Sequence, residues 1–219
     1  MKVIVSMSIS RVNGMLTENV RRLSSCGVEV NLDPTTGQSF GIGEKLKHIR
    51  QSAERFSEYD CIILSDGWDV MFYGTKQELL DKVPQNKVLW AAEKNCWPDA
   101  SIAHQIPLHG PWRFVNGGLL AGTPQALREM CDRIEANDSY GPDYVDQGFM
   151  NFLLATGEEF FEIDSETNLF FCLHLGYDEL QFKQGKPVNT LYGTTPLFVH
   201  ANGHWPTDEL FRKYEESLA

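Results

Sequence analysis

The sequence predicts an α/β protein with a Rossmann-like, mostly parallel β-sheet and helices on both of its faces. Apolar segments of strand length alternate with amphipathic helical segments along the 219 residues. Such alternation is typical of parallel strands joined by crossover helices. The segment DCIILS, residues 60–65, is apolar on both faces, as expected for a central parallel strand. A chain of this length fits one domain better than two, so we expect a single domain over residues 1–219.

The first half of the chain alternates strands and helices in a regular order. We expect them at residues 3–9 (strand), 15–26 (helix), 28–32 (strand), 44–56 (helix), 60–65 (strand), 75–83 (helix) and 87–93 (strand). Gly27 ends the first helix. A glycine-rich loop, residues 33–43, leads into the second helix. Leu46, Ile49 and Ala53 form an apolar stripe along that helix, which predicts that one face is buried.

A long loop over residues 94–114, rich in Pro, His and Trp, separates these elements from the second half. There we expect residues 117–122 (strand), 123–136 (helix), 143–156 (helix), 160–164 (strand), 168–173 (strand), 196–201 (strand) and 207–218 (helix). Thr123 and Pro124 are a favourable helix start, since threonine caps the N-terminus and proline is tolerated at the first helical position.

Composition and charge exclude several classes of protein. The formal net charge of −11 argues against a broad nucleic-acid surface, which requires a basic face. Five cysteines without a CxxC pair argue against disulfide scaffolds and zinc ribbons, and reduced thiols predict a cytoplasmic location. No segment approaches the ~18 apolar residues that a membrane-spanning helix requires. The apolar run at the N-terminus is too short for a secretory signal.

Two carboxylates, Asp66 and Asp69, follow the central strand in ILSDGWDVMF. Ligands of α/β sheets bind at the carboxyl ends of strands, and carboxylate oxygens suit Mg2+ or Mn2+ shared with substrate phosphates. A simple turn is the alternative, because Asp and Gly are common after strands. The three-residue spacing disfavours a haloacid-type phosphatase, which needs its aspartates two apart. The first strand is not followed by GxGxxG, so the dinucleotide-binding fold is not indicated.

Five sequence blocks occur in a defined order: ILSDGWDVMF, EKNCWPD, FVNGGLLAG, DYVDQGFMNFL and FVHANG. In order and approximate spacing they resemble the glycosyltransferase domain of procollagen lysyl hydroxylases and of procollagen galactosyltransferases. The resemblance extends from about residue 37 to 205, roughly three quarters of the chain. It implies a GT-A fold, a UDP-sugar donor and a divalent metal, Mn2+ or Mg2+.

The resemblance assigns the metal to Asp66, Asp69 and His200, the last in a His-x-Asn-Gly element. Sugar transfer breaks the bond between the anomeric carbon and a diphosphate, so negative charge grows on the leaving group. A metal that bridges its oxygens stabilises that charge. The function implied is transfer of a hexose from a UDP-sugar to a hydroxyl acceptor.

Donor binding is expected at residues within or near these blocks: Gly41, Gly43, Lys45, Trp68, Trp97, Asn116, Gly117, Gly118, Gln147, Asn202 and Gly203. Gly41 and Gly43 permit close backbone approach, and the helix after them presents its N-terminus to an anion. The resemblance implies that Lys45 contacts the donor and that Trp97 is a mobile gate over the sugar. A solvated lysine and a packed tryptophan are the alternatives.

The same resemblance places Trp68 between the metal aspartates, where an aromatic ring can stack on uracil or ribose. It places Asn116 and the backbone of Gly117 and Gly118 against the sugar.

Asp146 is the best candidate for a carboxylate that faces the acceptor, because an inverting transferase needs a base near the acceptor hydroxyl. Asp143 lies three residues earlier, on the same helix face if the helix begins there. Helix capping by Asp143 and a solvent salt link for Asp146 are the alternatives. Whether Asp146 acts as the base or as a ligand of a sugar hydroxyl stays open. The identity of the sugar and the stereochemical outcome also stay open.

One departure from the family concerns HANGHWPTDE, where HGNGPTK is expected, so the basic residue that meets the phosphates is lost or shifted. His204 is the candidate replacement. This departure leaves open a nucleotide-sugar binding protein without turnover. A second alternative is a glycosyltransferase for hydroxylated DNA bases, for which a local basic patch is available: Arg21, Arg22, Lys45, Lys47 and Arg50. The acceptor stays undecided between glycan, protein and modified nucleic acid.

Overall fold

A computed structural model describes the chain except for residues 11, 35–40, 108–109, 204–206 and 219. Within the described residues the central sheet has these strands: β1 Val3–Ile9, β2 Glu29–Pro34, β3 Cys61–Asp66, β5 Val88–Glu93, β6 Phe114–Gly122 and β7 Phe161–Ile163. Their order is β2-β1-β3-β6-β5-β7.

Most strand pairs of this sheet are parallel, as the alternation of strands and helices predicts. β1 is parallel to β2 and β3, and β5 is parallel to β7. The exception is β6, which is antiparallel to both of its neighbours, β3 and β5. An antiparallel neighbour needs no crossover helix, and β5 is joined to β6 by a loop in which the described residues form a short 3-10 helix, Ala100–Gln105.

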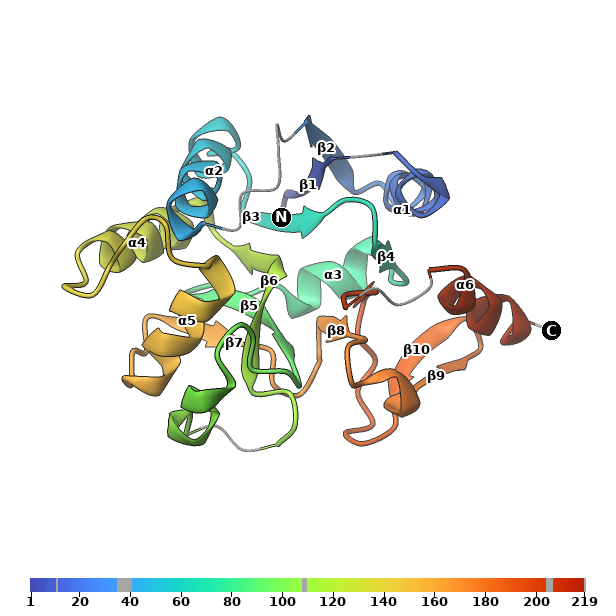
Figure 1. Ribbon diagram of the computed structural model, residues 1–219. Helices are drawn as coiled ribbons and strands as arrows, with labels where there is room; N and C mark the ends of the chain where they lie inside the picture. The colour runs from blue at the N-terminus through green and yellow to red at the C-terminus, as the bar shows by residue number, and fades with distance from the viewer. Residues whose placement is uncertain (11, 35–40, 108–109, 204–206, 219) are drawn as a thin grey trace.

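Helices cover both faces of the sheet, as predicted. Their bounds are α1 Gly14–Ser25, α2 Ile42–Arg55, α3 Lys76–Lys82, α4 Pro124–Glu135, α5 Asp146–Ala155 and α6 Thr207–Glu216. Figure 1 shows α2, α4 and α5 on one side and α1 on the other. Each side has its own core: Ile49, Leu127 and Phe149 belong to the first, and Leu23 and Leu79 belong to the second.

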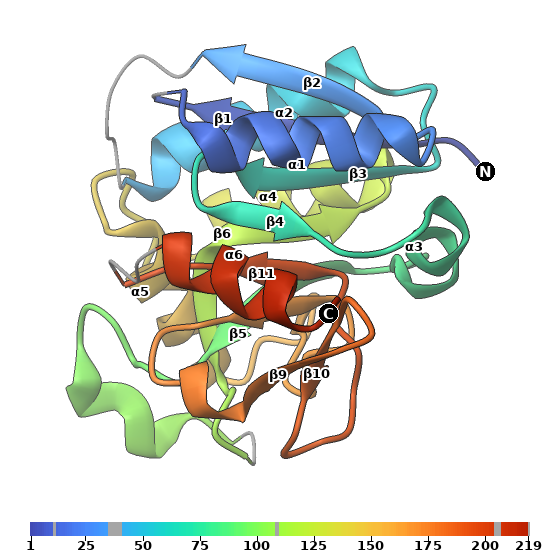
Figure 2. The same ribbon diagram turned by 90° about the vertical axis from the view of Figure 1, so that its right-hand side faces the viewer.

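A second, smaller sheet packs beside the first. It has the order β4-β11-β8, with β4 at Val70–Phe72, β8 at Phe170–Cys172 and β11 at Phe198–His200. β11 is antiparallel to β4 and parallel to β8. A hairpin of β9, Leu180–Lys183, and β10, Lys186–Asn189, lies below it, and α6 crosses in front of this part of the molecule (Figure 2).

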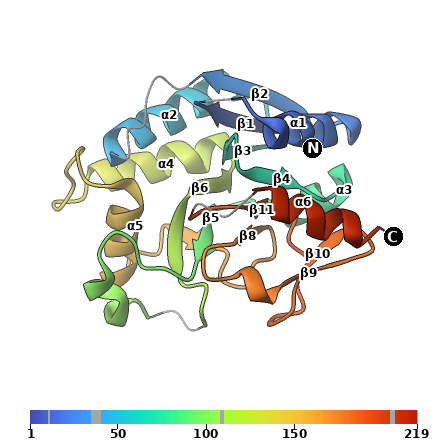
Figure 3. The same ribbon diagram turned by 45° about the vertical axis from the view of Figure 1, so that its right-hand side comes forward.

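The connection between β3 and β4 positions the candidate site, because it joins the two sheets. Gly67 to Asp69 lie in this connection, and the backbone N–H of Ala201 donates to the carbonyl of Asp69 at 2.8 Å. In the register of the small sheet, His200 is opposite Val70 on one side and Cys172 on the other. The end of β3 and the end of β11 therefore meet at one edge (Figure 3).

Several elements differ from the expectation. β4, β9 and β10 were not expected as strands, since runs of three or four residues carry almost no periodic signal. Residues 94–114 were expected to be loop throughout, yet they contain the 3-10 helix and the start of β6 at Phe114. α5 begins at Asp146 and not at residue 143. Within the described residues, no helix is long and apolar enough to span a membrane.

Candidate functional site

The three predicted metal ligands converge where the two sheets meet. Asp66 ends β3, Asp69 precedes β4, and His200 ends β11. The Nε2 atom of His200 lies 3.4 Å from Oδ2 of Asp69 and 3.7 Å from Oδ2 of Asp66. Each of the three residues offers one ligand atom, and these three atoms lie within 4.8 Å of one another. The structure therefore brings together side chains that are far apart in the sequence.

The donor set fits a divalent cation. Oδ1 of Asp69 is buried and has no hydrogen-bond partner among the described residues, and a bound cation supplies the partner that this oxygen lacks. Nδ1 of His200 lies 3.0 Å from the side-chain oxygen Oδ1 of Asn116. A hydrogen bond donated there leaves Nε2 facing the carboxylates, as a ligating imidazole requires. Two carboxylates and one imidazole suit Mn2+ or a similar ion and leave positions open for phosphate oxygens.

The charges at this edge are strongly coupled. Burial opposes protonation of His200, but the Asp69 carboxylate outweighs it and raises the pKa of His200 well above its usual value. Removal from water raises the pKa of Asp66, helped by Asp69 and Asp146 and opposed by His200 and Lys45. A proton on His200 thus balances the carboxylates when no cation is bound, and a cation must displace that proton.

Gly118 and Gly117 are required by the side chains around them. A Cβ atom at Gly118 would lie 2.7 Å from Oδ2 of Asp66 and would collide with the ring of His200. A Cβ atom at Gly117 would lie 2.9 Å from Oδ2 of Asp146. The N–H groups of both glycines also have partners, Gln147 Oε1 at 3.2 Å for Gly117 and Asn116 Oδ1 at 3.0 Å for Gly118. Contact of this backbone with a sugar stays a prediction.

Lys45 and Asp146 both belong to this site. The ammonium of Lys45 donates to the carbonyl of Gly117 at 2.6 Å. Its positive charge also opposes the rise in pKa that burial causes at Asp66 and Asp146. Burial is nevertheless the larger effect on Asp146 and raises the pKa of that carboxyl. Lys45 is thus a partly buried cation inside the site and not a solvated surface lysine.

The N-terminus of α2 differs from the expectation that it binds an anion. The N–H of Ile42 donates to the carbonyl of Tyr144 at 2.7 Å, and the N–H of Gly43 donates to the carbonyl of Pro142 at 3.0 Å. A Cβ at Gly43 would lie 2.8 Å from the Pro142 side chain, and Gly41 forms a bridge with Val145. These glycines let the loop before α5 approach, so the two N–H groups are not free for a phosphate.

Asp143 does not share a helix face with Asp146. It is exposed and lies in the turn before α5, which begins at Asp146 itself. The residues just before α5 form this turn because their carbonyl groups accept hydrogen bonds from α2. The alternative role of Asp143 as the helix cap is also wrong, since Val145 is the N-cap residue.

Glu93, at the end of β5, is a buried acid that the sequence analysis did not single out. Only 3% of it is exposed, and it accepts hydrogen bonds from Gln147 Nε2 and, at 2.7 Å, from Asn202 Nδ2. Burial raises its pKa to about 7, although Gln147, His200, Asn202 and Asn116 oppose the shift. The available signal was the acid that ends the apolar segment VLWAAE. Glu93 therefore connects Gln147 and Asn202, two residues that are predicted to bind the sugar donor, through hydrogen bonds.

The remaining predicted residues lie around this core of the site. Trp68 is half-buried, and its carbonyl accepts from Asn13 Nδ2 at 2.7 Å. Trp97 is 41% exposed, compatible with the predicted gate but equally with a surface position. Gly203 adopts a φ of 72° and packs against the ring of His174. His204 lies outside the described residues.

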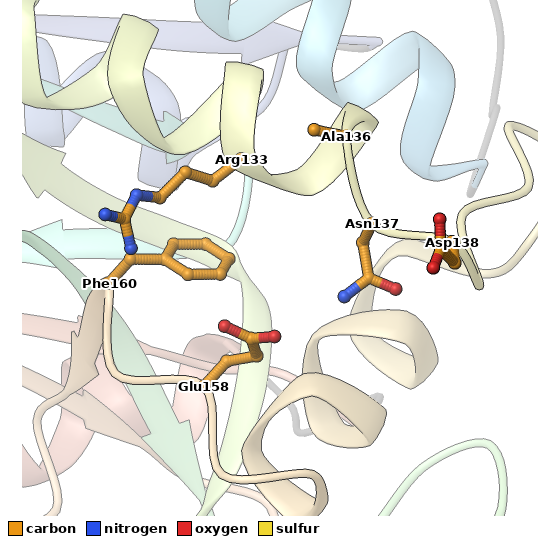
Figure 4. A pocket seen from close by; sticks show the side chains of 6 residues that line it. All are labelled: Arg133, Ala136, Asn137, Asp138, Glu158 and Phe160. Atoms are coloured by element: carbon orange, nitrogen blue, oxygen red, sulfur yellow. The ribbon is translucent and has the colours of Figure 1, made fainter.

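A separate hollow of about 350 Å3 lies near the C-terminal end of α4 (Figure 4). It is lined by Arg133, Ala136, Asn137, Asp138, Glu158 and Phe160. The guanidinium of Arg133 lies over the ring of Phe160, 5.7 Å from its centre. None of these residues belongs to the predicted site, and the hollow offers no cluster of ligands for a cation.

Comparison with known proteins was made on sequence and on structure. The family model described as the PLOD GT domain matches residues 25–214. The multifunctional procollagen lysine hydroxylase and glycosyltransferase LH3 of Homo sapiens is 27% identical over 181 residues, which cover 76% of this chain and 24% of that protein. The procollagen-lysine,2-oxoglutarate 5-dioxygenase of Drosophila melanogaster is 32% identical, with the same coverage. The chain therefore spans about a quarter of the length of these relatives.

The fold also has a solved counterpart. A glycosyltransferase involved in the glycosylation of the major capsid of PBCV-1 superimposes with a TM-score of 0.57. The match covers 99% of this chain and 100% of the other, at 14% sequence identity. At that identity the likeness concerns the fold alone, and it confirms the predicted GT-A architecture.

Proposed function

The chain belongs to the PLOD GT domain family, and from that premise we propose that it is a metal-dependent glycosyltransferase that moves a hexose from a UDP-sugar to a hydroxyl acceptor. The observation that carries this proposal is the convergence of Asp66, Asp69 and His200, together with a buried oxygen of Asp69 that has no hydrogen-bond partner among the described residues. Donor diphosphate and cation complete such a set, whereas a turn that uses aspartates for hydrogen bonding leaves no oxygen unpaired.

The residues of the site have separate tasks in this proposal. Asp66, Asp69 and His200 hold the cation, which when bound offsets charge on the leaving diphosphate. Asn116 keeps the imidazole of His200 in the ligating orientation. Lys45 holds the carbonyl of Gly117 and lies close to two carboxylates, so it fixes the strand that borders the sugar.

Asp146 is the proposed base for the acceptor hydroxyl. Burial raises the pKa of its carboxyl group, with Lys45 and the N–H of Gln147 opposing the shift. A raised pKa makes the ionised carboxylate a stronger proton acceptor. The hydroxyl proton passes to Asp146 as the acceptor oxygen bonds to the anomeric carbon and the bond to the diphosphate breaks.

The acceptor is proposed only as a hydroxyl-bearing molecule, and a cytoplasmic location stays part of the proposal. The basic patch that supported a DNA acceptor is largely neutralised. Arg21 and Arg22 pair with Glu18. Lys47 lies 3.7 Å from Glu44, and Arg50 pairs with acids of α4. Most of the residues of the patch are therefore paired with acids, and we propose a glycan or protein hydroxyl ahead of a DNA base.

A thermal-shift panel tests the donor and the metal together. We expect UDP-glucose, UDP-galactose or UDP-N-acetylglucosamine, and free UDP, to stabilise the protein only with Mn2+, and GDP-mannose to fail. A ligand at about 100 times its dissociation constant adds about 2.7 kcal/mol. Donor hydrolysis measured on the same samples separates an enzyme from a binding protein without turnover. Equal shifts with and without Mn2+ would contradict the metal site.

A further inference from the structure

His174 lies just after the small sheet, beside the candidate site. β8 and β11 are parallel, with Cys172 opposite His200, and the N–H of His174 donates to Oδ1 of Asn202 at 3.0 Å. His174 and Asn202 lie in the turns that follow these strands, each two residues beyond the strand end. This hydrogen bond therefore joins the two turns directly after the strand that carries the candidate ligand His200.

The ring of His174 has Gly203 and Glu93 as neighbours. Gly203 packs against it so closely that a Cβ there would lie 2.8 Å from Cγ of the ring. Nδ1 of His174 lies 3.8 Å from Oε2 of the buried Glu93, the same oxygen that accepts from Asn202. The side chain is 32% exposed, and within the described part of the chain Nε2 has no hydrogen-bond partner. His174 thus presents one ring nitrogen outward from a fixed position.

The backbone just after His174 is strained. Leu175 has a φ of 58°, in the left-handed region that a leucine rarely adopts, and it is 59% exposed. The turn is closed by the N–H of Gly176, which donates to the carbonyl of Leu173 at 2.8 Å. His174 itself lies in this turn, two residues after the end of β8. Strain of this kind is concentrated where a side chain must hold a special position.

Charge balance indicates what His174 contacts. A divalent cation held by Asp66 and Asp69 is neutral overall, so the negative charges of a diphosphate need further donors. Lys45 lies beside Gly117 and Asp146. His174 lies next to Glu93 and beside Asn202, which is two residues after the candidate ligand His200. His174 is therefore a further donor near the candidate metal ligands.

We propose that His174 is a substrate-contacting residue whose Nε2–H donates a hydrogen bond to the β-phosphate of the donor, with Glu93 beside the other ring nitrogen. The inference rests on the proposed function, since it requires a nucleoside diphosphate at the metal. As the bond between the anomeric carbon and the β-phosphate oxygen breaks, the electron pair goes to that oxygen. The hydrogen bond from His174 strengthens as the β-phosphate gains this charge.

The experiment compares UDP with UMP, which lacks the β-phosphate. Titration calorimetry in Mn2+ measures both affinities for the wild type, for His174→Ala and for His174→Gln. We expect His174→Ala to weaken UDP about 10-fold or more and to leave UMP within about 2-fold. His174→Gln, which keeps an N–H donor, should recover part of the loss. UMP binding itself reports that each variant is folded.

The exposed His104, whose ring contacts only its own turn in the described structure, is the matched control. His104→Ala should bind both nucleotides like the wild type. Unchanged UDP affinity in His174→Ala would overturn the inference, as would an equal loss for UDP and UMP. A wild type that binds no UDP in Mn2+ would instead overturn the proposed function. A raised KM for the acceptor with normal UDP affinity would place His174 at the acceptor and also refute the inference.

Discussion

Asp69 and Asp164 are both 5% exposed, yet their carboxylates differ in how they are satisfied. Asp164, just after β7, accepts from the N–H groups of Asn168, Leu169 and Phe170 at 2.7 to 2.8 Å, so both of its oxygens are used. Asp69 has one buried oxygen, Oδ1, without a hydrogen-bond partner in the described part of the chain. Burial alone therefore does not mark a functional carboxylate. The informative feature is a buried oxygen that the fold leaves unpaired.

The polar and charged groups around the two aspartates also differ. Burial raises the pKa of Asp164, opposed by its three N–H donors and by Lys82, which lies nearby. These donors belong to the turn that leads into β8, so Asp164 joins two strands. Asp69 instead shares its edge with Asp66 and His200. One aspartate stabilises a turn, and the other belongs to the candidate metal site.

The largest expected effect comes from Asp69→Asn. We expect turnover to fall by about 1,000-fold or more, because one metal ligand and the charge that balances the cation are lost. The Mn2+-dependent thermal shift should disappear as well. The free energy of unfolding without metal should change less than in Asp164→Ala, since Asn keeps the volume and His200 can release its proton.

Turnover and Mn2+ titrations of purified Asp69→Asn measure this effect. Full activity of this variant, or an unchanged shift with Mn2+, would contradict the metal role of Asp69.

Asp164→Ala should give the opposite result. Three buried N–H groups lose their acceptor, and we expect the free energy of unfolding to fall by about 4 kcal/mol. The specific activity of the folded protein and its shift with Mn2+ should stay near the wild-type values. Urea denaturation at low temperature measures the loss, with Asp69→Asn as the matched control. A stable but inactive Asp164→Ala protein would remove the distinction between the two aspartates.

Glu93 is a third buried acid, and it differs from the two aspartates in that its pKa lies near neutral pH. Its pKa is raised from 4.5 to about 7 by burial. Between these values the folded protein binds more protons than the unfolded chain, so the free energy of unfolding falls as pH rises from about 4.5 to 7. We expect the wild type to lose about 3 kcal/mol across this window relative to Glu93→Gln. Urea denaturation in EDTA measures the free energy of unfolding of both proteins at each pH. The same pH dependence in the two proteins would contradict the raised pKa of Glu93.

Gly118→Ala is expected to have the smallest effect of the set. The added methyl group collides with His200 and Asp66, so these ligands must move apart and Mn2+ affinity should fall about 10- to 100-fold. The control is Thr123→Ala, which removes the N-cap of α4 directly after the end of β6. It should lower the free energy of unfolding by about 1 kcal/mol and leave the Mn2+ affinity normal. Equal Mn2+ affinity in Gly118→Ala would show that the site tolerates a side chain there.

Much of the fold could be predicted from local patterns. The helical stripe Leu46, Ile49 and Ala53 is fully buried, and Thr123 caps α4 by accepting from the N–H of Ala126. Short strands such as β4 could not be predicted, because their partners lie elsewhere in the chain. The antiparallel direction of β6 also depends on its neighbours and not on its own residues.

The sequence by itself determined the alternating elements, the aspartates after β3 and the family blocks, since each rests on neighbouring residues. Only the tertiary structure decided that Asp69 and not Asp164 keeps a free oxygen, that α2 uses its first N–H groups on the loop before α5, and that Glu93 and His174 meet. The physical reason is that the satisfaction of a buried polar group depends on which distant segments pack against it. That packing joins residues whose separation along the chain carries no local signal.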